Sequence, residues 1–101
     1  MAIDKLEIVW TKLSQNDMRN AFDYISQDSV QNAVTVLEDI VSMANKAITN
    51  PEFFSPDKYK ENNDGSYRAF EKHHYRISYR FDNKVIRILR VRHTSREPIL
   101  Y

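Results

Sequence analysis

The chain has 101 residues, a net charge of +1 and no cysteine. This length suits one two-layer core and is too short for two, so we expect a single domain over residues 1–101. The absence of cysteine excludes disulfides and thiolate metal ligands, and no apolar run reaches the roughly 20 residues that a membrane helix needs. No signal-peptide pattern opens the chain, which indicates a soluble cytoplasmic protein.

The first part of the chain predicts a strand followed by a helix. Apolar residues alternate with other residues over 6–10, the two-residue period of a half-buried strand. Ser14 followed by Asp17 resembles a capping box, and apolar residues recur at helical spacing as far as Ile25. We therefore expect a helix over about residues 14–27.

A second helix follows almost immediately. Ser29 can cap it, and its apolar positions form one stripe until Asn50 and Pro51 stop the helix. Only Gln27 and Asp28 separate the two helices, so they must fold back as an antiparallel hairpin. Further apolar residues lie beside or off the stripe and extend the apolar surface beyond what one sheet face can cover. These residues, which we expect a partner to cover, are Val36, Met43 and Ala47.

Residues 51–65 predict a loop that is long for a compact domain. We expect Phe53 and Phe54 to fasten this loop to the edge of the sheet. Further along, Lys58 and Lys60 flank an aromatic residue, and such interleaving of basic and aromatic groups is typical of nucleic-acid surfaces.

The last third of the chain predicts three antiparallel strands, over residues 67–72, 75–81 and 84–92. Within 75–81 the odd positions are large and apolar, while the even positions are Arg, Ser and Arg. His73-His74 falls at the first turn, and Asp82-Asn83 predicts a two-residue hairpin because both residue types tolerate positive φ. The fold class is therefore α+β, with a strand, a two-helix hairpin and a three-stranded meander.

This pattern also predicts which side chains form the core. The expected core residues are Leu6, Ile8, Trp10, Phe22, Ile25, Val34, Leu37, Ile40, Val41, Ile77, Tyr79, Leu89 and Val91.

Charge is distributed unevenly along the chain. Residues 1–65 carry six Lys/Arg against eleven Asp/Glu, and residues 66–101 carry nine against three. Because the basic part holds the predicted meander, the positive charge suits an anionic partner, either nucleic acid or an acidic protein segment. The alternative is a solvated face that only keeps the protein soluble. The candidate binding residues are Arg76, Arg80, Arg90 and Arg92 on one sheet face, with Lys58 and Lys60 from the loop.

Several segments follow one another in a distinctive order. They are Tyr24-Ile25, Gly65-Ser66-Tyr67-Arg68, Tyr75-Arg76-Ile77-Ser78-Tyr79, and the run from Ile86 to His93 followed by Arg96. With the order of the predicted elements, these segments resemble the RelE/ParE toxin superfamily. The resemblance implies a toxin of a type II toxin-antitoxin module, held inactive by a cognate antitoxin in a hetero-oligomer.

Members that resemble RelE cleave mRNA on the ribosome without a metal. That chemistry needs a base for the ribose 2′-OH, cations for the phosphorane and an acid for the leaving oxygen. The resemblance implies a catalytic set of Arg68, Arg76, His93, Arg96 and Tyr101. The set is incomplete, because Phe70 stands where a second basic residue is typical, and Tyr101 is the last residue, where fraying is expected. For His93 we favour a structural role, a backbone hydrogen bond that closes the strand, over catalysis.

Members that resemble ParE share the fold, lack most of these groups and poison DNA gyrase through protein contact. The incomplete set favours this mechanism. Ribosome-dependent mRNA cleavage is the first alternative, and an inactive remnant that only binds antitoxin is the second. We expect no cofactor, no membrane partner and no metal, since the adjacent His73 and His74 make a poor metal pair. An antitoxin helix is expected to dock on the second helix and an extended tail to reach the basic sheet.

Overall fold

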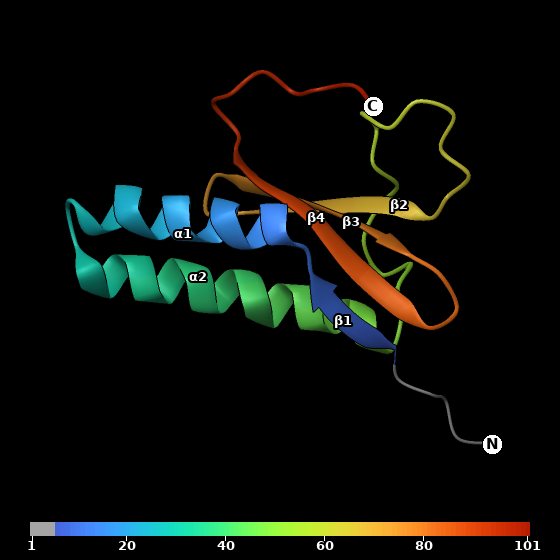
Figure 1. Cartoon of the computed structure of the whole chain (residues 1–101), viewed down its shortest axis with the longest axis horizontal. Coiled ribbons are helices and arrows are strands. Elements are labelled where there is room, and N and C mark those ends of the chain that lie inside the picture. Colours follow the sequence, from blue (N-terminus) through green and yellow to red (C-terminus); the bar gives the residue numbers. More distant parts are fainter. Residues whose placement is uncertain (1–5) are drawn as a thin grey trace.

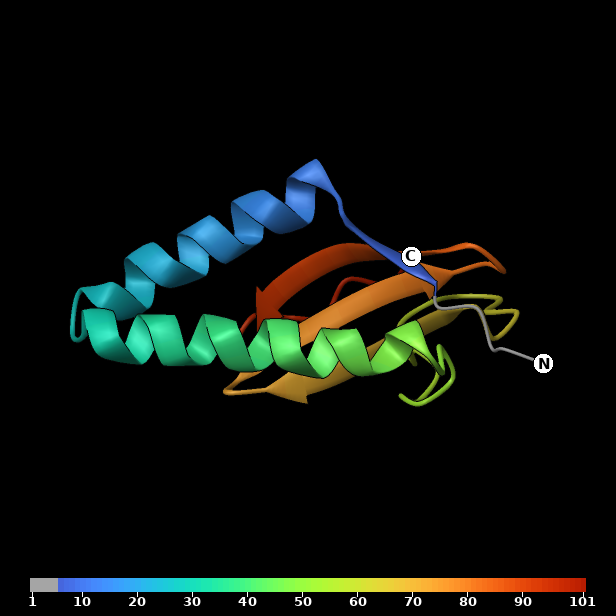
Figure 2. The same cartoon turned by 90° about the horizontal axis from the view of Figure 1, so that it is seen from below.

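The computed structural model describes residues 6–101. Its elements are β1 (Glu7–Trp10), α1 (Lys12–Ser26), α2 (Val30–Asn45), the short 3-10 helix η1 (Lys46–Ile48), β2 (Tyr67–Lys72), β3 (Tyr75–Phe81) and β4 (Val85–His93). The four strands form one sheet in the order β1-β4-β3-β2. Both helices cover one face of this sheet, and β1 lies at the edge, parallel to β4 (Figures 1 and 2). The predicted α+β class and order of elements are confirmed.

The first helix begins earlier than predicted because Thr11, not Ser14, is its N-cap. The Thr11 hydroxyl accepts a hydrogen bond from the Ser14 backbone N–H at 3.2 Å and donates one to the Ile88 carbonyl at 2.8 Å. Thr11 thus joins the helix start to β4. Ser14 is fully buried and donates to the Thr11 carbonyl, so it packs inside the first turn instead of capping it. The predicted capping box is wrong.

The second helix is capped by Ser29, as predicted, but buries a different stripe. Its Ser29 hydroxyl accepts from the Asn32 backbone N–H at 3.1 Å. Val34 and Val41, predicted in the core, are 36% and 38% exposed. The residues that the helix buries are Ala33, Val36, Ile40, Ala44 and, from η1, Ala47.

The three residues predicted to bind a partner on this helix are therefore misplaced. Val36 and Ala47 are only 5% and 1% exposed. Met43 is half-buried and packs against the core. Because these side chains are used by the fold, they do not form a docking surface.

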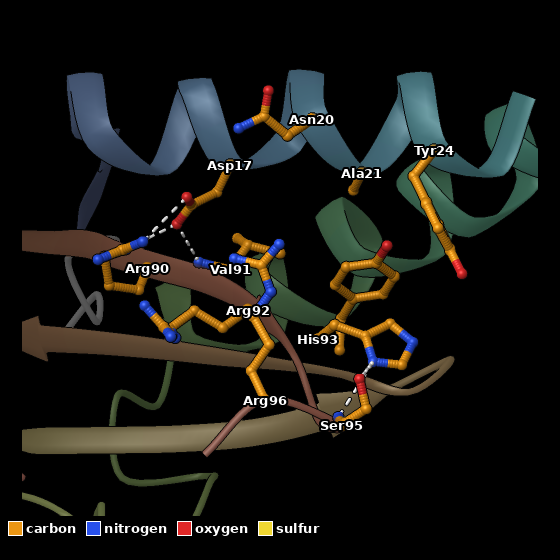
Figure 3. Close-up of a pocket in the computed structure, with 11 residues that line it drawn as sticks. Asp17, Asn20, Ala21, Tyr24, Arg90, Val91, Arg92, His93, Ser95 and Arg96 are labelled. Carbon is orange, nitrogen blue, oxygen red and sulfur yellow. Dashed lines mark hydrogen bonds and ion pairs between the residues drawn. The ribbon is translucent and has the colours of Figure 1, made fainter. Parts of the chain in front are cut away.

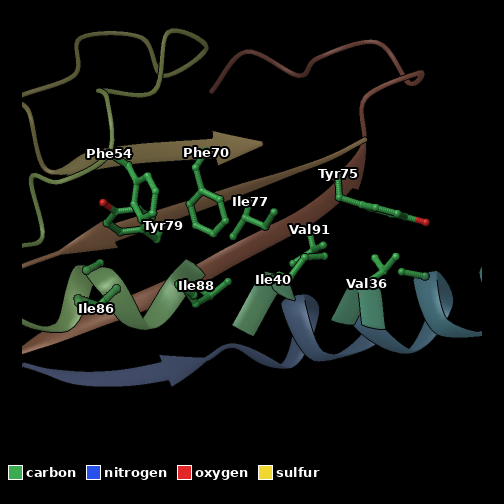
Figure 4. Close-up of a cluster of buried hydrophobic side chains, with 13 residues drawn as sticks. Val36, Ile40, Phe54, Phe70, Tyr75, Ile77, Tyr79, Ile86, Ile88 and Val91 are labelled. Atoms are coloured by element: carbon green, nitrogen blue, oxygen red, sulfur yellow. The ribbon is translucent and has the colours of Figure 1, made fainter. Parts of the chain in front are cut away.

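The core lies between α2 and the sheet (Figure 4). Ile77, Tyr79, Ile86 and Ile88 have no exposed surface. Burial raises the pKa of Tyr79 to about 12, so its hydroxyl stays protonated and donates to the Pro51 carbonyl at 2.6 Å.

A β-bulge in β4 changes which residues face this core. Tyr79 pairs with Ile88 while the preceding Ser78 pairs with Arg90, so Leu89 has no partner on β3. The extra residue reverses the alternation of side chains. Ile88 therefore occupies the core, and Leu89, which we predicted there, lies half-buried near the other face.

The two meander turns fall where they are predicted, with different geometry. His73 and His74 have φ of 52° and 68°, the paired positive values of a two-residue hairpin turn. The second turn has three residues, 82–84, and needs no positive φ. There the Asp82 carboxylate accepts from the backbone N–H groups of Lys84 and Val85, both at 2.8 Å.

Only one of the two loop phenylalanines fastens the loop. Phe54 is 9% exposed and stacks on Phe70, with ring centroids 4.3 Å apart. Phe53 is 56% exposed, so the prediction that it also fastens the loop is wrong.

Among the helices described, none is long and apolar enough to cross a membrane.

Candidate functional site

Strand pairing brings the predicted arginines to one side of the sheet. Arg76 lies opposite Arg92, and Arg80 lies opposite Arg87. Arg90 lies opposite Ser78 on the same side. These residues alternate with the buried side chains, so they belong to the face turned away from the helices, which we call the open face.

Part of the open face is covered by residues 94–101, which we call the return segment, while Arg80 and Arg87 on the same face stay exposed. After β4 this segment turns back over the sheet and ends beside the loop that precedes β2 (Figure 1). The Tyr101 backbone N–H donates to the Tyr59 carbonyl at 3.1 Å, and the Glu61 N–H donates to the Tyr101 carbonyl at 2.6 Å. Tyr101 is therefore held by backbone pairing, contrary to the predicted fraying.

One loop carboxylate joins the return segment to the sheet. Asp57 is 3% exposed and accepts from an Arg76 guanidinium nitrogen at 2.8 Å. It also accepts from the Tyr101 hydroxyl at 2.6 Å and from the Tyr59 backbone N–H at 3.0 Å. Burial alone raises the pKa of Asp57, but the hydrogen bonds from Tyr101, Arg76 and Tyr59 outweigh it and leave that pKa below its ordinary value. We call these four residues the Asp57 clamp.

The clamp fixes the protonation of Tyr101 as well. Burial, the hydrogen bond to Asp57 and the negative charge of Asp57 all raise the pKa of the Tyr101 hydroxyl. Tyr101 is therefore a weaker acid than a free tyrosine, and its proton already bonds a carboxylate. An acid for RNA cleavage would have to give that proton to the leaving oxygen.

Three further cations, Arg80 on β3 and Lys58 and Lys60 in the loop, lie over aromatic rings. Arg80 lies 5.5 Å from the Tyr67 ring centroid, and Lys60 lies 4.8 Å from the same ring and 5.5 Å from that of Tyr101. Lys58 is 5.3 Å from the Tyr59 ring. The predicted interleaving of basic and aromatic groups is present, and its contacts fasten the loop and the return segment.

Arg68 lies apart from the other candidate catalytic residues. It pairs with Tyr79 on β3, so its side chain is on the helix-covered side of the sheet. Its guanidinium donates to the carbonyls of Gly65 at 2.8 Å and Phe54 at 3.1 Å. Gly65 itself has a φ of 96°, which suits glycine. Arg68 therefore holds the turn and the loop, and the predicted set does not come together.

His93 makes the backbone contact that its structural interpretation predicts. Its Nδ1 accepts from the Ser95 backbone N–H at 3.0 Å and lies 2.7 Å from the Ser95 hydroxyl. The ring packs edge-on against Tyr75, with centroids 5.1 Å apart. His93 thus closes the turn after β4. Arg96, the last of the candidates, is exposed in the return segment.

A groove of about 470 Å³ lies between the return segment and the open face. This volume falls within the roughly 300–1,000 Å³ of ordinary ligand pockets. Its apolar wall combines Leu13 and Leu89 with Pro98 and Ile99, while Arg76 and Arg92 supply charge. Sequence reasoning missed the groove and Asp57 alike. An isolated aspartate in a loop carries no local signal for a partner 44 residues away.

The comparisons with known proteins agree with this fold. The family described as ParE toxin of type II toxin-antitoxin system, parDE, matches residues 8–98. No curated protein matches the chain.

Three solved structures share the fold of this chain. The chromosomal ParDE toxin-antitoxin system from P. aeruginosa is similar at 18% identity and TM-score 0.69, over 89% of this chain and 97% of that one. The toxin-antitoxin complex RelBE2 from Mycobacterium tuberculosis is similar at 19% identity and TM-score 0.59, over 88% and 98%. The YoeB dimer from Staphylococcus aureus is similar at 17% identity and TM-score 0.60, over 88% and 97%. Since the family match covers residues 8–98, the chain belongs to the ParE toxin family of type II toxin-antitoxin systems.

Proposed function

We propose that this toxin inhibits growth by poisoning DNA gyrase through protein contact, and that a cognate antitoxin neutralises it. Membership of the ParE family supports this mechanism over RNA cleavage. The open face offers the toxin a rigid, charged surface for protein contact.

The observation that carries the proposal is the state of Arg76 and Tyr101. Both side chains bond to the buried carboxylate of Asp57. Metal-free RNA cleavage needs an unengaged cation at the phosphorane and an acid at the leaving oxygen. Here the cation is neutralised and the acid is weakened, while Arg68 lies on the opposite side of the sheet.

Ribosome-dependent mRNA cleavage is the second candidate, and one observation favours it. The Asp57 clamp holds Arg76 and Tyr101 within bonding distance of the same group. A loop movement that withdrew Asp57 would leave a cation and an acid side by side. The third candidate, a remnant that only binds antitoxin, requires that neither activity exists.

Expression without antitoxin separates the three candidates. We expect growth arrest with trapped gyrase–DNA cleavage complexes and intact mRNA. Primer extension on a translated message tests the second candidate: codon-positioned cuts that vanish in Arg76→Ala and Tyr101→Phe, but persist in Arg87→Ala, would overturn the gyrase mechanism. Arg87 is the matched control because it is an exposed arginine of β4 whose ion pair is with Asp82. Normal growth would favour the remnant.

The antitoxin is proposed to place an acidic segment on the open face. Arg92 is the most informative residue there, because Arg76 and Arg90 already pair with Asp57 and Asp17. Peripheral ion pairs are worth about 0 to 1 kcal/mol, so Arg92→Gln should mainly slow association and flatten its salt dependence. Association rates at two salt concentrations, with Arg19→Gln on the exposed surface of α1 as control, test this placement. An equal loss in both variants would contradict it.

A further inference from the structure

The edge of the sheet at β2 is covered by the loop that precedes this strand. The Ala69 backbone N–H donates to the Ser55 carbonyl at 3.1 Å, and the Asp57 N–H donates to the Tyr67 carbonyl at 2.8 Å. The loop thus pairs with backbone groups of β2 that point away from β3. Covering an edge in this way keeps it from pairing with another chain.

The part of β4 that lies beyond β1 is also satisfied, in this case by α1. β1 pairs with β4 only as far as Ile88. Further along, Asp17 Oδ2 accepts from the Val91 backbone N–H at 2.9 Å and from Arg90 Nε at 2.8 Å (Figure 3). A carboxylate of α1 therefore takes the place that a longer β1 would fill.

The outer edge of β1 has no such cover. Glu7 and Thr11 donate their backbone N–H groups to carbonyls of β4, so the alternating groups of Ile8 and Trp10 point the other way. Within residues 6–101, the N–H groups of Ile8 and Trp10 and the Ile8 carbonyl have no hydrogen-bond partner. No helix or strand lies in front of β1 in Figure 2. These three backbone groups form what we call the open edge.

The open edge is closed off at both ends but not blunted between them. At one end the Leu6 N–H donates to the Ile48 carbonyl at 3.0 Å, and at the other the Trp10 carbonyl accepts from Gln15 Nε2 at 2.8 Å. Soluble proteins commonly protect an edge strand with proline, lysine or a bulge, and β1 contains none of these. Instead Val9, at its middle, is 38% exposed.

We propose that the open edge pairs with the open edge of a second copy of this chain. Antiparallel pairing about a two-fold axis satisfies both edges at once, because each copy offers the same groups. We place Val9 opposite Val9, so that Ile8 of each copy exchanges N–H···O bonds with Trp10 of the other. The Trp10 carbonyl has a second lone pair for this bond beside the one that Gln15 uses. The two exposed Val9 side chains then cover each other.

The charges beside the open edge suit a second copy. In this register Glu7 lies opposite Thr11 of the other copy and one position from Lys12, so like charges do not face each other. An acidic segment would instead meet Glu7. Because β1 has only four residues, the contact is smaller than the roughly 1,200–2,000 Å² of a stable interface, and we expect a weak, reversible dimer.

The pairing leaves the surfaces used elsewhere accessible. A two-fold axis between antiparallel strands is perpendicular to the sheet, so both open faces lie on one side of the joined sheet and the helices on the other. The inference goes beyond gyrase poisoning and antitoxin binding, because it concerns the isolated toxin. Its test therefore fails or succeeds independently of the proposed function.

Cross-linking through an introduced cysteine tests the register. The chain contains no cysteine, so Val9→Cys gives a single thiol at the centre of the contact. Facing residues of a non-hydrogen-bonded pair have Cα atoms about 4.5 Å apart, which a disulfide spans, so mild oxidation should yield a covalent dimer. Val30→Cys, at a 60% exposed valine of α2, is the matched control and should cross-link far more slowly. Equal rates would overturn the inference.

Sedimentation velocity of the purified toxin, from micromolar to millimolar concentration, tests the dimer itself. We expect reversible dimerisation of the wild type. Val9→Lys and Val9→Glu should each weaken it about tenfold or more, because like charges meet in place of two apolar side chains. An equal mixture of the two variants should restore association, since opposite charges then face each other. Val30→Lys should dimerise like the wild type.

The contrary outcomes are equally distinct. Thermal melts check that the variants fold, and Val9 is partly exposed, so they should. A toxin that stays monomeric throughout the series, or a dimer indifferent to Val9→Lys, would overturn the inference. Protection of the Ile8 amide from hydrogen exchange only after antitoxin is added would assign the open edge to the antitoxin instead.

Discussion

The two faces of the sheet are closed by different kinds of interaction. The helix-covered face is closed by apolar packing, in which Ile77, Ile86 and Ile88 are fully buried (Figure 4). The open face is closed by a short segment that one carboxylate, Asp57, fastens. Apolar burial scales with area and is insensitive to pH, whereas a polar clamp depends on each partner and on its protonation. We therefore expect the two faces to respond differently to substitution and to pH.

The largest expected effect is on the helix-covered face. Ile40→Ala should lower the free energy of unfolding by about 2–5 kcal/mol, because Ile40 is fully buried and the truncation leaves a cavity. Val41→Ala on the neighbouring position should cost less than about 1 kcal/mol, since Val41 is partly exposed. Denaturant melts of both variants measure the difference. Similar losses would show that α2 packs with the other stripe.

The contacts on the open face should contribute less to the free energy of unfolding than the apolar core does, and Asp57→Asn tests this expectation. The substitution keeps the size of the side chain and removes the charge that Arg76 and Tyr101 contact. We expect a loss of about 1.5–3 kcal/mol and release of the return segment, because a hydrogen bond to a charged group is worth that much. Asp28→Asn, at an exposed carboxylate, should leave stability unchanged. If Asp57→Asn matched the Ile40→Ala loss while the return segment stayed bound, the clamp would instead be part of the core.

The smallest effect is the pH dependence of the clamp. The pKa of Tyr101 is raised above 10.0, so its contribution is fully present below about pH 10 and is lost as the pH rises toward the raised value. The pKa of Asp57 is lowered below 3.8, so its contribution is present above about pH 4 and is lost as the pH falls through the lowered value. Tyr101→Phe should remove the alkaline part of this dependence. Denaturant melts of the wild type and of Tyr101→Phe across a range of pH measure this dependence. If both proteins lost the same stability at alkaline pH, the clamp would be contradicted.

The helix-covered face was largely predictable because its signals are local. Alternation located β3, and Ser29 marked the start of α2. Two errors came from features that hydrophobicity does not encode. Ala33 and Ala44 are buried on α2 while Val34 is partly exposed, although alanine is the weaker hydrophobic signal in the sequence. Leu89 lies outside the core because a β-bulge inserts one residue into β4, and the sequence of β4 contains no pattern that predicts the bulge.

The open face was predictable only in part. Alternation placed Arg76 and Arg92 on one side, as the strand pairing bears out. The partner that neutralises Arg76 lies in an irregular loop, and the residue that completes the clamp, Tyr101, is 44 positions further along the chain. Contacts of this kind depend on tertiary structure and leave no periodic signal. Asp17 is similar, since its spacing from Ser14 suggested a cap while its actual partner, Arg90, lies on β4.

The central claim is that the Asp57 clamp keeps the return segment on the open face, with Arg76 and Tyr101 engaged. Amide hydrogen exchange at Tyr101 tests it most directly, because this N–H donates to the Tyr59 carbonyl only when the segment is in place. We predict protection of the Tyr101 amide in the wild type at neutral pH, and its loss in Asp57→Asn. Exchange at the rate of an unstructured chain in the wild type would contradict the claim.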